Sequence, residues 1–111
     1  GLIDAAAIAK MKSSAYIVNT ARGSIVDEAA LVDALQERRI AGAALDVFEQ
    51  EPVPEDSPVW TTENLVMTPH MCGDALGWRT RLAELFVENF ERFGRGEDLK
   101  NVVDKRLRFV P

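Results

Sequence analysis

Three short apolar runs, set apart by helical and polar segments, constrain the fold of this chain more than any other feature. They lie at 15–19 (AYIVN), 42–48 (GAALDVF) and 65–68 (LVMT), and each has a length typical of a strand. A segment with helical spacing separates the first two. Strands that alternate with helices are typical of a parallel sheet built from crossover units, which indicates an α/β fold. We expect the first run to be a strand buried on both faces.

Capping residues and helical spacing predict the helices. Asp4 is a candidate N-cap for a short helix near the start of the chain, and Asp27 for a second helix that continues to about residue 39. Residues 73–97 predict a long helix that stops near Gly94 and carries an apolar stripe of Leu82, Leu85, Phe86, Phe90 and Phe93.

The proline-rich and acidic loop between the second and third apolar runs predicts a segment without regular structure. Its composition includes Pro52, Pro54 and Pro58. Trp60 is the candidate anchor of this loop, since it is the large apolar residue at its far end.

Composition excludes several classes of protein. With 111 residues, 47% of them hydrophobic, the chain is long enough for one modest core. A net charge of −5 argues against nucleic acid as a partner. No apolar run is long enough for a membrane span, no leader pattern opens the chain, and one cysteine excludes an internal disulfide. These features favour the cytoplasm.

Arg22, Glu51 and His70 each follow one of the apolar runs, so we expect them at the edge of the sheet where ligands bind. A guanidinium fork matches a carboxylate, and imidazole exchanges protons near neutral pH. A carboxylate on the second ring nitrogen fixes the tautomer. Composition alone does not choose between Glu49 and Glu51 for that carboxylate. The triplet predicts a site for a small carboxylate-bearing substrate.

The segments MKSSAYIVNTARGSIVDEAALVDAL, GAALDVFEQEP and NLVMTPH occur in this order. Together they resemble the C-terminal part of a D-isomer-specific 2-hydroxyacid dehydrogenase, over nearly the whole chain. The resemblance implies the C-terminal half of a Rossmann-type NAD-binding domain with parallel strands, followed by a long C-terminal helix. It also implies hydride transfer between NAD or NADP and a D-2-hydroxy or 2-keto acid.

The resemblance assigns roles to single residues. Arg22 binds the substrate carboxylate, His70 is the acid-base catalyst and Glu51, rather than Glu49, pairs with it. The same resemblance places a set of residues near the cofactor: Thr20, Ala21, Arg22, Asp46, His70, Met71 and Cys72. Asp46 has the alternative of pinning the loop that follows it. No metal is implied.

The same resemblance divides the chain into three parts. Residues 1–73 correspond to the C-terminal part of the dinucleotide-binding domain, 74–94 to a long interdomain helix, and 95–111 to a tail that returns to a substrate domain. We expect a homodimer for the parent protein. An exposed stripe on the long helix predicts self-association of the chain by itself.

Two other functions stay open at this level. Relatives with the same fold include corepressors that sense a dinucleotide and act through protein contacts, and the chain alone could be an inactive self-associating piece. The intact triplet favours the enzyme. The sequence leaves open which 2-keto acid is the substrate and whether the cofactor is NAD or NADP.

The 111 residues contain no Gly-x-Gly-x-x-Gly turn, the element that cradles a dinucleotide pyrophosphate. We therefore expect this chain to be a fragment that by itself binds NAD weakly or not at all and turns nothing over. A fluorescence titration of the purified chain with NADH checks this. Saturable binding in the micromolar range would contradict it.

Overall fold

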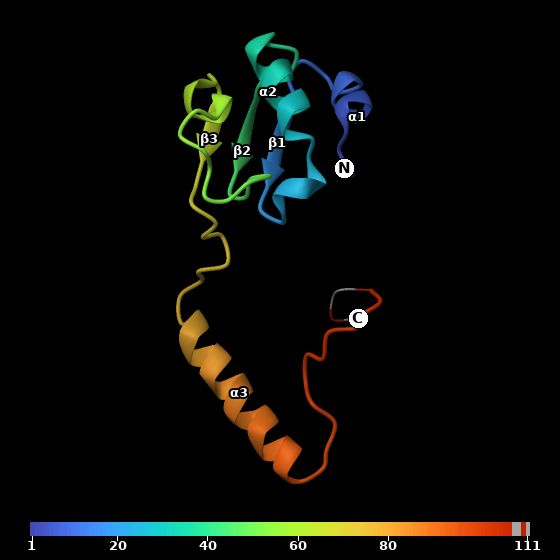
Figure 1. Ribbon diagram of the computed structural model, residues 1–111, viewed down its shortest axis with the longest axis vertical. Helices are drawn as coiled ribbons and strands as arrows, with labels where there is room; N and C mark the ends of the chain where they lie inside the picture. Colours follow the sequence, from blue (N-terminus) through green and yellow to red (C-terminus); the bar gives the residue numbers. More distant parts are fainter. Residues whose placement is uncertain (108–109, 111) are drawn as a thin grey trace. The chain divides into compact units, whose positions relative to one another are not determined.

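The computed structural model describes residues 1–107 and 110, which form two compact units, 1–73 (unit 1) and 74–111 (unit 2) (Figure 1). Of the predicted tail at 95–111, residues 108, 109 and 111 lie outside the described residues. The elements follow one another as α1 (Ala5–Ala9), β1 (Tyr16–Asn19), η1 (Gly23–Ile25), α2 (Glu28–Gln36), β2 (Gly42–Leu45), η2 (Pro58–Thr61), β3 (Leu65–Met67) and α3 (Trp78–Gly94).

Unit 1 is built on a sheet of three parallel strands in the order β1-β2-β3. Val18 lies opposite Ala44 and Ala44 opposite Val66, so β2 is the central strand. Strands that run in the same direction need crossover connections, and α2 supplies the one between β1 and β2. The predicted α/β class with parallel strands and a long C-terminal helix is confirmed.

Both predicted caps are present at the helices of unit 1. The Asp4 carboxylate accepts a hydrogen bond from the Ala7 N–H at 2.8 Å, and the Asp27 carboxylate accepts one from the Ala30 N–H at 3.0 Å. Each satisfies a helix N–H that has no partner within the helix. The caps therefore start α1 and α2 at the positions that the sequence predicts.

The core of unit 1 lies between α2 and one face of the sheet. Leu31 and Leu35 of α2 are almost fully buried and share one hydrophobic cluster with Ile17 of β1 and Leu45 of β2. Full burial of one such side chain stabilises a fold by about 1.5–3 kcal/mol. This cluster also contains Ile8, so it holds α1 as well.

The other face of the sheet is exposed, so the prediction of a first strand buried on both faces is wrong for this chain. Side chains alternate along β1, and those of Tyr16 and Val18 are 72% and 69% exposed. Val66 of β3 shares this face and is also exposed. An apolar run such as 15–19 contains residues that can be buried. They are buried only on a face that another element covers, and within unit 1 only one face of the sheet is covered.

The loop between β2 and β3 contains a short 3-10 helix, η2, where no regular structure was expected. Pro58 occupies its first position, where a fixed φ favours a helical start. Val59 is 1% exposed and is the buried anchor of the loop. The predicted anchor, Trp60, keeps most of its ring exposed, but its Nε1–H donates to the Pro54 carbonyl at 2.7 Å.

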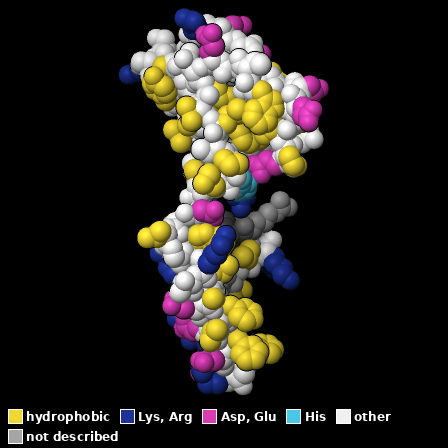
Figure 2. Space-filling model, turned by 90° about the vertical axis from the view of Figure 1, so that its left-hand side faces the viewer, with side chains coloured by type: hydrophobic (Ala, Val, Ile, Leu, Met, Phe, Trp, Pro, Cys, Tyr) yellow, Lys and Arg dark blue, Asp and Glu magenta, His cyan; other side chains and the backbone are white. Residues whose placement is uncertain are grey.

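Unit 2 contains α3 and the segment after it. The helix begins at Trp78 rather than at residue 73, because Gly77 adopts a left-handed φ of 75° just before it. None of its residues is buried, and apolar side chains gather along it (Figure 2). The side chain of Asn89 exchanges two hydrogen bonds with the backbone of Lys100, which ties the following segment back to the helix.

Across residues 1–107 and 110, no helix combines the length and the apolar character that crossing a bilayer requires.

Candidate active site

The three loops that leave the C-terminal ends of β1, β2 and β3 meet at one edge of the sheet. Asn19, Leu45 and Met67 are the last residues of their strands and lie in register with one another. Ligands of open parallel sheets bind at this edge. The predicted triplet of Arg22, Glu51 and His70 lies in these loops.

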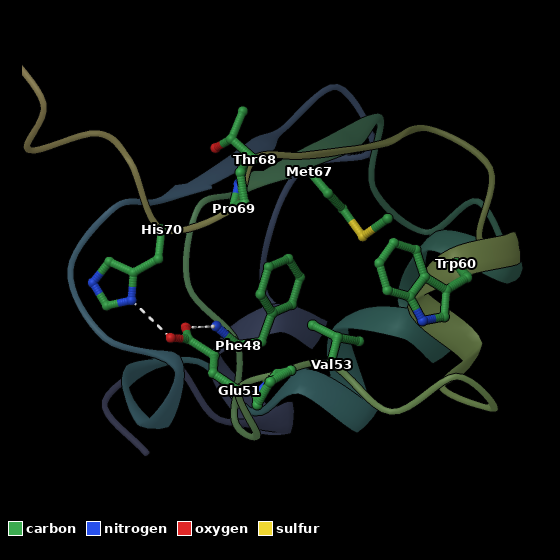
Figure 3. Close-up of a pocket in the computed structure, with 9 residues that line it drawn as sticks. Phe48, Glu51, Val53, Trp60, Met67, Thr68, Pro69 and His70 are labelled. Atoms are coloured by element: carbon green, nitrogen blue, oxygen red, sulfur yellow. Dashed lines mark hydrogen bonds and ion pairs between the residues drawn. The ribbon is translucent and has the colours of Figure 1, made fainter.

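Glu51 and His70 form a direct pair. The His70 Nδ1 lies 2.7 Å from Glu51 Oε2, and Glu51 Oε1 accepts the Phe48 N–H at 2.9 Å (Figure 3). Glu49 does not share this role: its own N–H donates to Glu28 Oε2, and Glu51 is the carboxylate on the imidazole. With Nδ1 engaged, Nε2 is the ring nitrogen left to exchange a proton.

The environment of Glu51 favours its charged form. The hydrogen bond with His70 contributes most to lowering the pKa of the Glu51 carboxyl, followed by the bond from the Phe48 N–H, and the Arg22 charge adds to it. Glu51 is therefore a carboxylate at neutral pH. A carboxylate at Nδ1 stabilises an imidazolium when Nε2 takes up a proton.

Asp46 follows β2 and holds the loop that carries the histidine. Its Oδ1 accepts the Thr68 hydroxyl at 2.5 Å and the Met71 N–H at 2.9 Å, and its Oδ2 accepts the Cys72 N–H at 2.9 Å. His70 lies between these contacts with a left-handed φ of 52°. A non-glycine residue with such a φ persists where its surroundings hold it, and such residues gather at functional sites.

The Asp46 carboxyl is buried and ionised. Burial by itself raises the pKa of this group, but the hydrogen bonds from Thr68, Cys72 and Met71 outweigh it, and the pKa lies far below its usual range. The donors to this carboxylate come from the Thr68 hydroxyl and from the two backbone N–H groups that follow His70. Asp46 is therefore bonded on both of its oxygens and is 3% exposed.

Arg22 lies in the turn after β1 and faces the same region as the Glu51–His70 pair. All three residues line one cavity of about 300 Å³. The guanidinium is exposed and donates to the Ala21 carbonyl at 2.6 Å. Thr20 and Ala21, which were predicted to contact a cofactor, lie exposed in this turn. The structure thus brings the predicted triplet together around one small space.

Glu51 and His70 also line a larger cavity of about 610 Å³, which is mainly apolar. Phe48, Val53, Trp60 and Met67 face it, whereas the His70 ring points away from them (Figure 3). Its walls offer few polar groups. The small cavity with Arg22 is therefore the one whose chemistry suits a carboxylate-bearing substrate.

Sequence reasoning missed three contributors to this site. They are Asn19, whose side chain bonds to the arginine turn, Thr68, which donates to Asp46, and the Phe48 N–H, which holds Glu51. A polar Asn at the end of an apolar run was the available signal for Asn19. Cys72 presents an exposed side chain, and partial desolvation and the nearby Asp46 carboxylate raise the pKa of its thiol.

Within the part of the chain that the structure describes, no cluster of His, Cys, Asp and Glu has the arrangement of a metal site.

Comparisons with known proteins identify the family of this chain. Residues 1–72 match the family model described as the NAD binding domain of D-isomer specific 2-hydroxyacid dehydrogenases. The chain is 48% identical over 98 residues to a glyoxylate reductase of Korarchaeum cryptofilum, covering 88% of this chain and 30% of that protein. It is 46% identical to a glyoxylate reductase of Thermofilum pendens, covering 96% of this chain and 31% of that protein. The chain thus spans about a third of the length of these relatives.

Solved structures show the same likeness. A D-isomer specific 2-hydroxyacid dehydrogenase from Xanthobacter autotrophicus Py2, in complex with NADPH and MES, is 45% identical with a TM-score of 0.87, covering 98% of this chain and 44% of that one. An NADPH-dependent glyoxylate/hydroxypyruvate reductase from Sinorhizobium meliloti, in complex with NADP and sulfate, is 32% identical with a TM-score of 0.85, covering 98% and 35%.

The bonds to Asp46 predict a pH-dependent stability. Asp46→Asn places an amide NH₂ or a weaker acceptor against N–H groups that now meet a carboxylate, so it should destabilise the protein at pH 6. Because the folded-state pKa is lowered, this contribution is complete above the unfolded value of about 3.9 and is lost as the pH falls through the folded value. Urea unfolding of the wild type and of Asp46→Asn measures the free energy of unfolding of each. The difference between the two free energies should be smaller at pH 3 than at pH 6.

The matched control is Asp33→Asn, which replaces an exposed acid of α2. Its free energy of unfolding should differ little from that of the wild type at either pH. A difference for Asp46→Asn of equal size at pH 6 and pH 3 would contradict the assignment.

Proposed function

Since the chain belongs to the D-isomer specific 2-hydroxyacid dehydrogenase family, we propose that its parent protein transfers a hydride between NAD(P) and a small 2-keto or D-2-hydroxy acid. The observation that carries this proposal is the Glu51–His70 hydrogen bond on the same cavity as Arg22. An acid-base pair beside a carboxylate anchor is what reduction of a 2-keto acid requires.

Arg22 supplies the anchor in this proposal. A guanidinium offers several N–H donors in a planar fork, so it binds a carboxylate through two parallel hydrogen bonds. Its exposed position in the turn after β1 leaves it accessible to a ligand in the small cavity. A 2-keto acid bound there presents its keto oxygen next to its carboxylate, and hence near the positive charge.

His70 supplies the proton. In reduction, protonated Nε2 donates to the keto oxygen as it becomes a hydroxyl, and in oxidation neutral Nε2 takes the hydroxyl proton. Glu51 on Nδ1 keeps the ring in the orientation that leaves Nε2 free and stabilises the imidazolium. Asp46 accepts hydrogen bonds from the two backbone N–H groups that follow His70, and these bonds hold the backbone from which the ring projects.

The residues at the sheet edge fit the nicotinamide end of a dinucleotide. Thr20 and Ala21 are exposed at this edge, and Asp46 holds the Cys72 segment beside it. When bound, the nicotinamide supplies or accepts the hydride. The pyrophosphate end has no matching glycine-rich turn in these 111 residues, so the same proposal holds that the isolated chain is inactive.

The identities of two similar proteins support a short substrate. The relatives from Korarchaeum cryptofilum and Thermofilum pendens are glyoxylate reductases, and the similar enzyme of Sinorhizobium meliloti is described as NADPH-dependent. Glyoxylate and hydroxypyruvate are therefore the first keto acids to assay, each with NADH and with NADPH. Dimerisation of the parent and self-association through α3 belong to the same proposal. The paired Glu51 and His70 favour an enzyme over a corepressor that only senses the dinucleotide.

Replacing His70 tests the proposed proton transfer. In the protein expressed from its complete reading frame, His70→Asn should lower kcat by about 10²- to 10⁴-fold, the usual contribution of a general acid. Asn tolerates the left-handed backbone of this position, so the fold is kept. Steady-state kinetics with NADH, together with NADH affinity by fluorescence, measure the effect.

The matched control is Glu55→Gln, which removes an exposed acid of the loop that carries Glu51 and should keep kcat within about twofold, as surface changes usually do. The acid-base role is wrong if His70→Asn turns over keto acid at the wild-type rate.

Arg22→Gln tests the carboxylate anchor. Loss of a charge-assisted bond should raise KM for the keto acid by about 10- to 100-fold, with NADH affinity nearly unchanged. Arg22→Lys keeps the positive charge and loses the planar fork of N–H donors. Its KM for the keto acid should therefore lie between those of the wild type and Arg22→Gln. A variant that loses NADH affinity while its keto-acid KM stays constant would move Arg22 from substrate to cofactor binding.

A further inference from the structure

Asn19 is a buried polar residue whose side chain bonds to the turn that carries Arg22. It is 5% exposed at the end of β1. Its Nδ2 donates to the Arg22 carbonyl at 2.9 Å, and its Oδ1 accepts the Ala21 N–H at 3.1 Å. Asn side chains that bond to backbone groups two or three residues ahead stabilise tight turns. Burial of an amide is costly unless it is hydrogen-bonded, so these contacts define the place of Asn19.

The backbone of Asn19 belongs to the sheet and thus links this turn to the rest of the site. Its carbonyl accepts the Asp46 N–H at 2.9 Å, one step beyond the β1–β2 ladder. Asp46 in turn holds the loop of His70 through its side chain. One residue at the end of β1 therefore bonds to the arginine turn and to the residue that holds the histidine loop.

Close backbone packing at Gly23 adds a second constraint on the same turn. A Cβ at this position would lie 1.9 Å from the Phe48 carbonyl oxygen, which no side chain tolerates without a backbone shift. The N–H of Phe48 holds Glu51. The residue after Arg22 thus lies directly against the carbonyl of Phe48, the residue whose N–H bonds to the Glu51 carboxylate.

We propose that Asn19 is a positioning residue, whose amide holds the Arg22 turn so that the guanidinium faces the Glu51–His70 pair across the small cavity. Asn19 acts through Arg22, because its side-chain amide bonds to the backbone of the arginine turn. The proposal rests on the proposed role of Arg22 as the carboxylate anchor. Misplacement of the anchor weakens substrate binding more than it slows the proton transfer at His70.

Two variants of Asn19 separate its two hydrogen bonds. Asn19→Asp keeps an acceptor for the Ala21 N–H and removes the donor to the Arg22 carbonyl, and Asn19→Ala removes both. Thr62→Val is the matched control, since Thr62 is a buried side chain of unit 1 that donates to a backbone carbonyl away from the arginine turn. All three are made in the protein expressed from its complete reading frame.

Kinetics give the first readout. Asn19→Ala should raise KM for the 2-keto acid by about tenfold, the usual worth of one to two lost hydrogen bonds, with kcat and NADH affinity changed less than about threefold. Asn19→Asp should raise KM as well, because the Arg22 carbonyl loses its donor. Thr62→Val should leave KM unchanged. A drop in kcat and NADH affinity with unchanged KM in both Asn19 variants would overturn the proposal.

Amide hydrogen exchange of residues 20–25 gives a readout that needs no activity. Exchange of the Ala21 N–H should be fast in Asn19→Ala and slow in Asn19→Asp and Thr62→Val. Equal protection in Asn19→Ala and wild type would overturn the proposal even if the protein reduces no keto acid. Absence of keto-acid turnover in the wild type, with the expected exchange pattern, would instead reject the proposed function and keep Asn19 as the residue that holds the turn. If Asn19→Ala does not fold, the KM of Asn19→Asp for the 2-keto acid tests the proposal: a raised KM supports it and an unchanged KM overturns it.

Discussion

Parallel pairing of β2 with both of its neighbours brings the loops of the candidate site together at one edge of the sheet. Because the three strands run in one direction and end in register, the loops that follow them leave the sheet side by side. Arg22, Glu51 and His70, of which the first and last are 48 positions apart in sequence, thereby line one cavity of about 300 Å³. Strand pairing brings the three loops together, and the Glu51–His70 hydrogen bond then joins two of them.

Two buried polar side chains at the strand ends convert this closeness into a defined geometry. Asn19 ends β1 and bonds to the arginine turn, and Asp46 follows β2 and bonds to the histidine loop. Both are at most 5% exposed, so any loss of their partners leaves a desolvated polar group. The reacting side chains themselves stay accessible: His70 and Glu51 are exposed and touch each other at 2.7 Å. The buried side chains thus hold the loops, and the exposed side chains are accessible to a ligand.

Some predictions succeeded because they depend on local chemistry. Asp4 and Asp27 cap α1 and α2 as predicted, since a short acid before a helix meets free N–H groups whatever surrounds it. Others failed because they depend on neighbours. The burial of both faces of β1 and the start of α3 each require knowledge of which element lies alongside or where a φ angle turns positive.

The sequence by itself determined the α/β class, the strands and the loops that carry Arg22, Glu51 and His70, because periodicity, capping and motif order are properties of neighbouring residues. Composition left Glu49 and Glu51 as alternatives and the family resemblance favoured Glu51; the tertiary structure shows Glu51 on the imidazole, a contact that depends on where the chain turns. It also revealed Asn19 and the bonds of Asp46. These are contacts between separate segments, and their energy depends on burial and distance, neither of which is written in residue order.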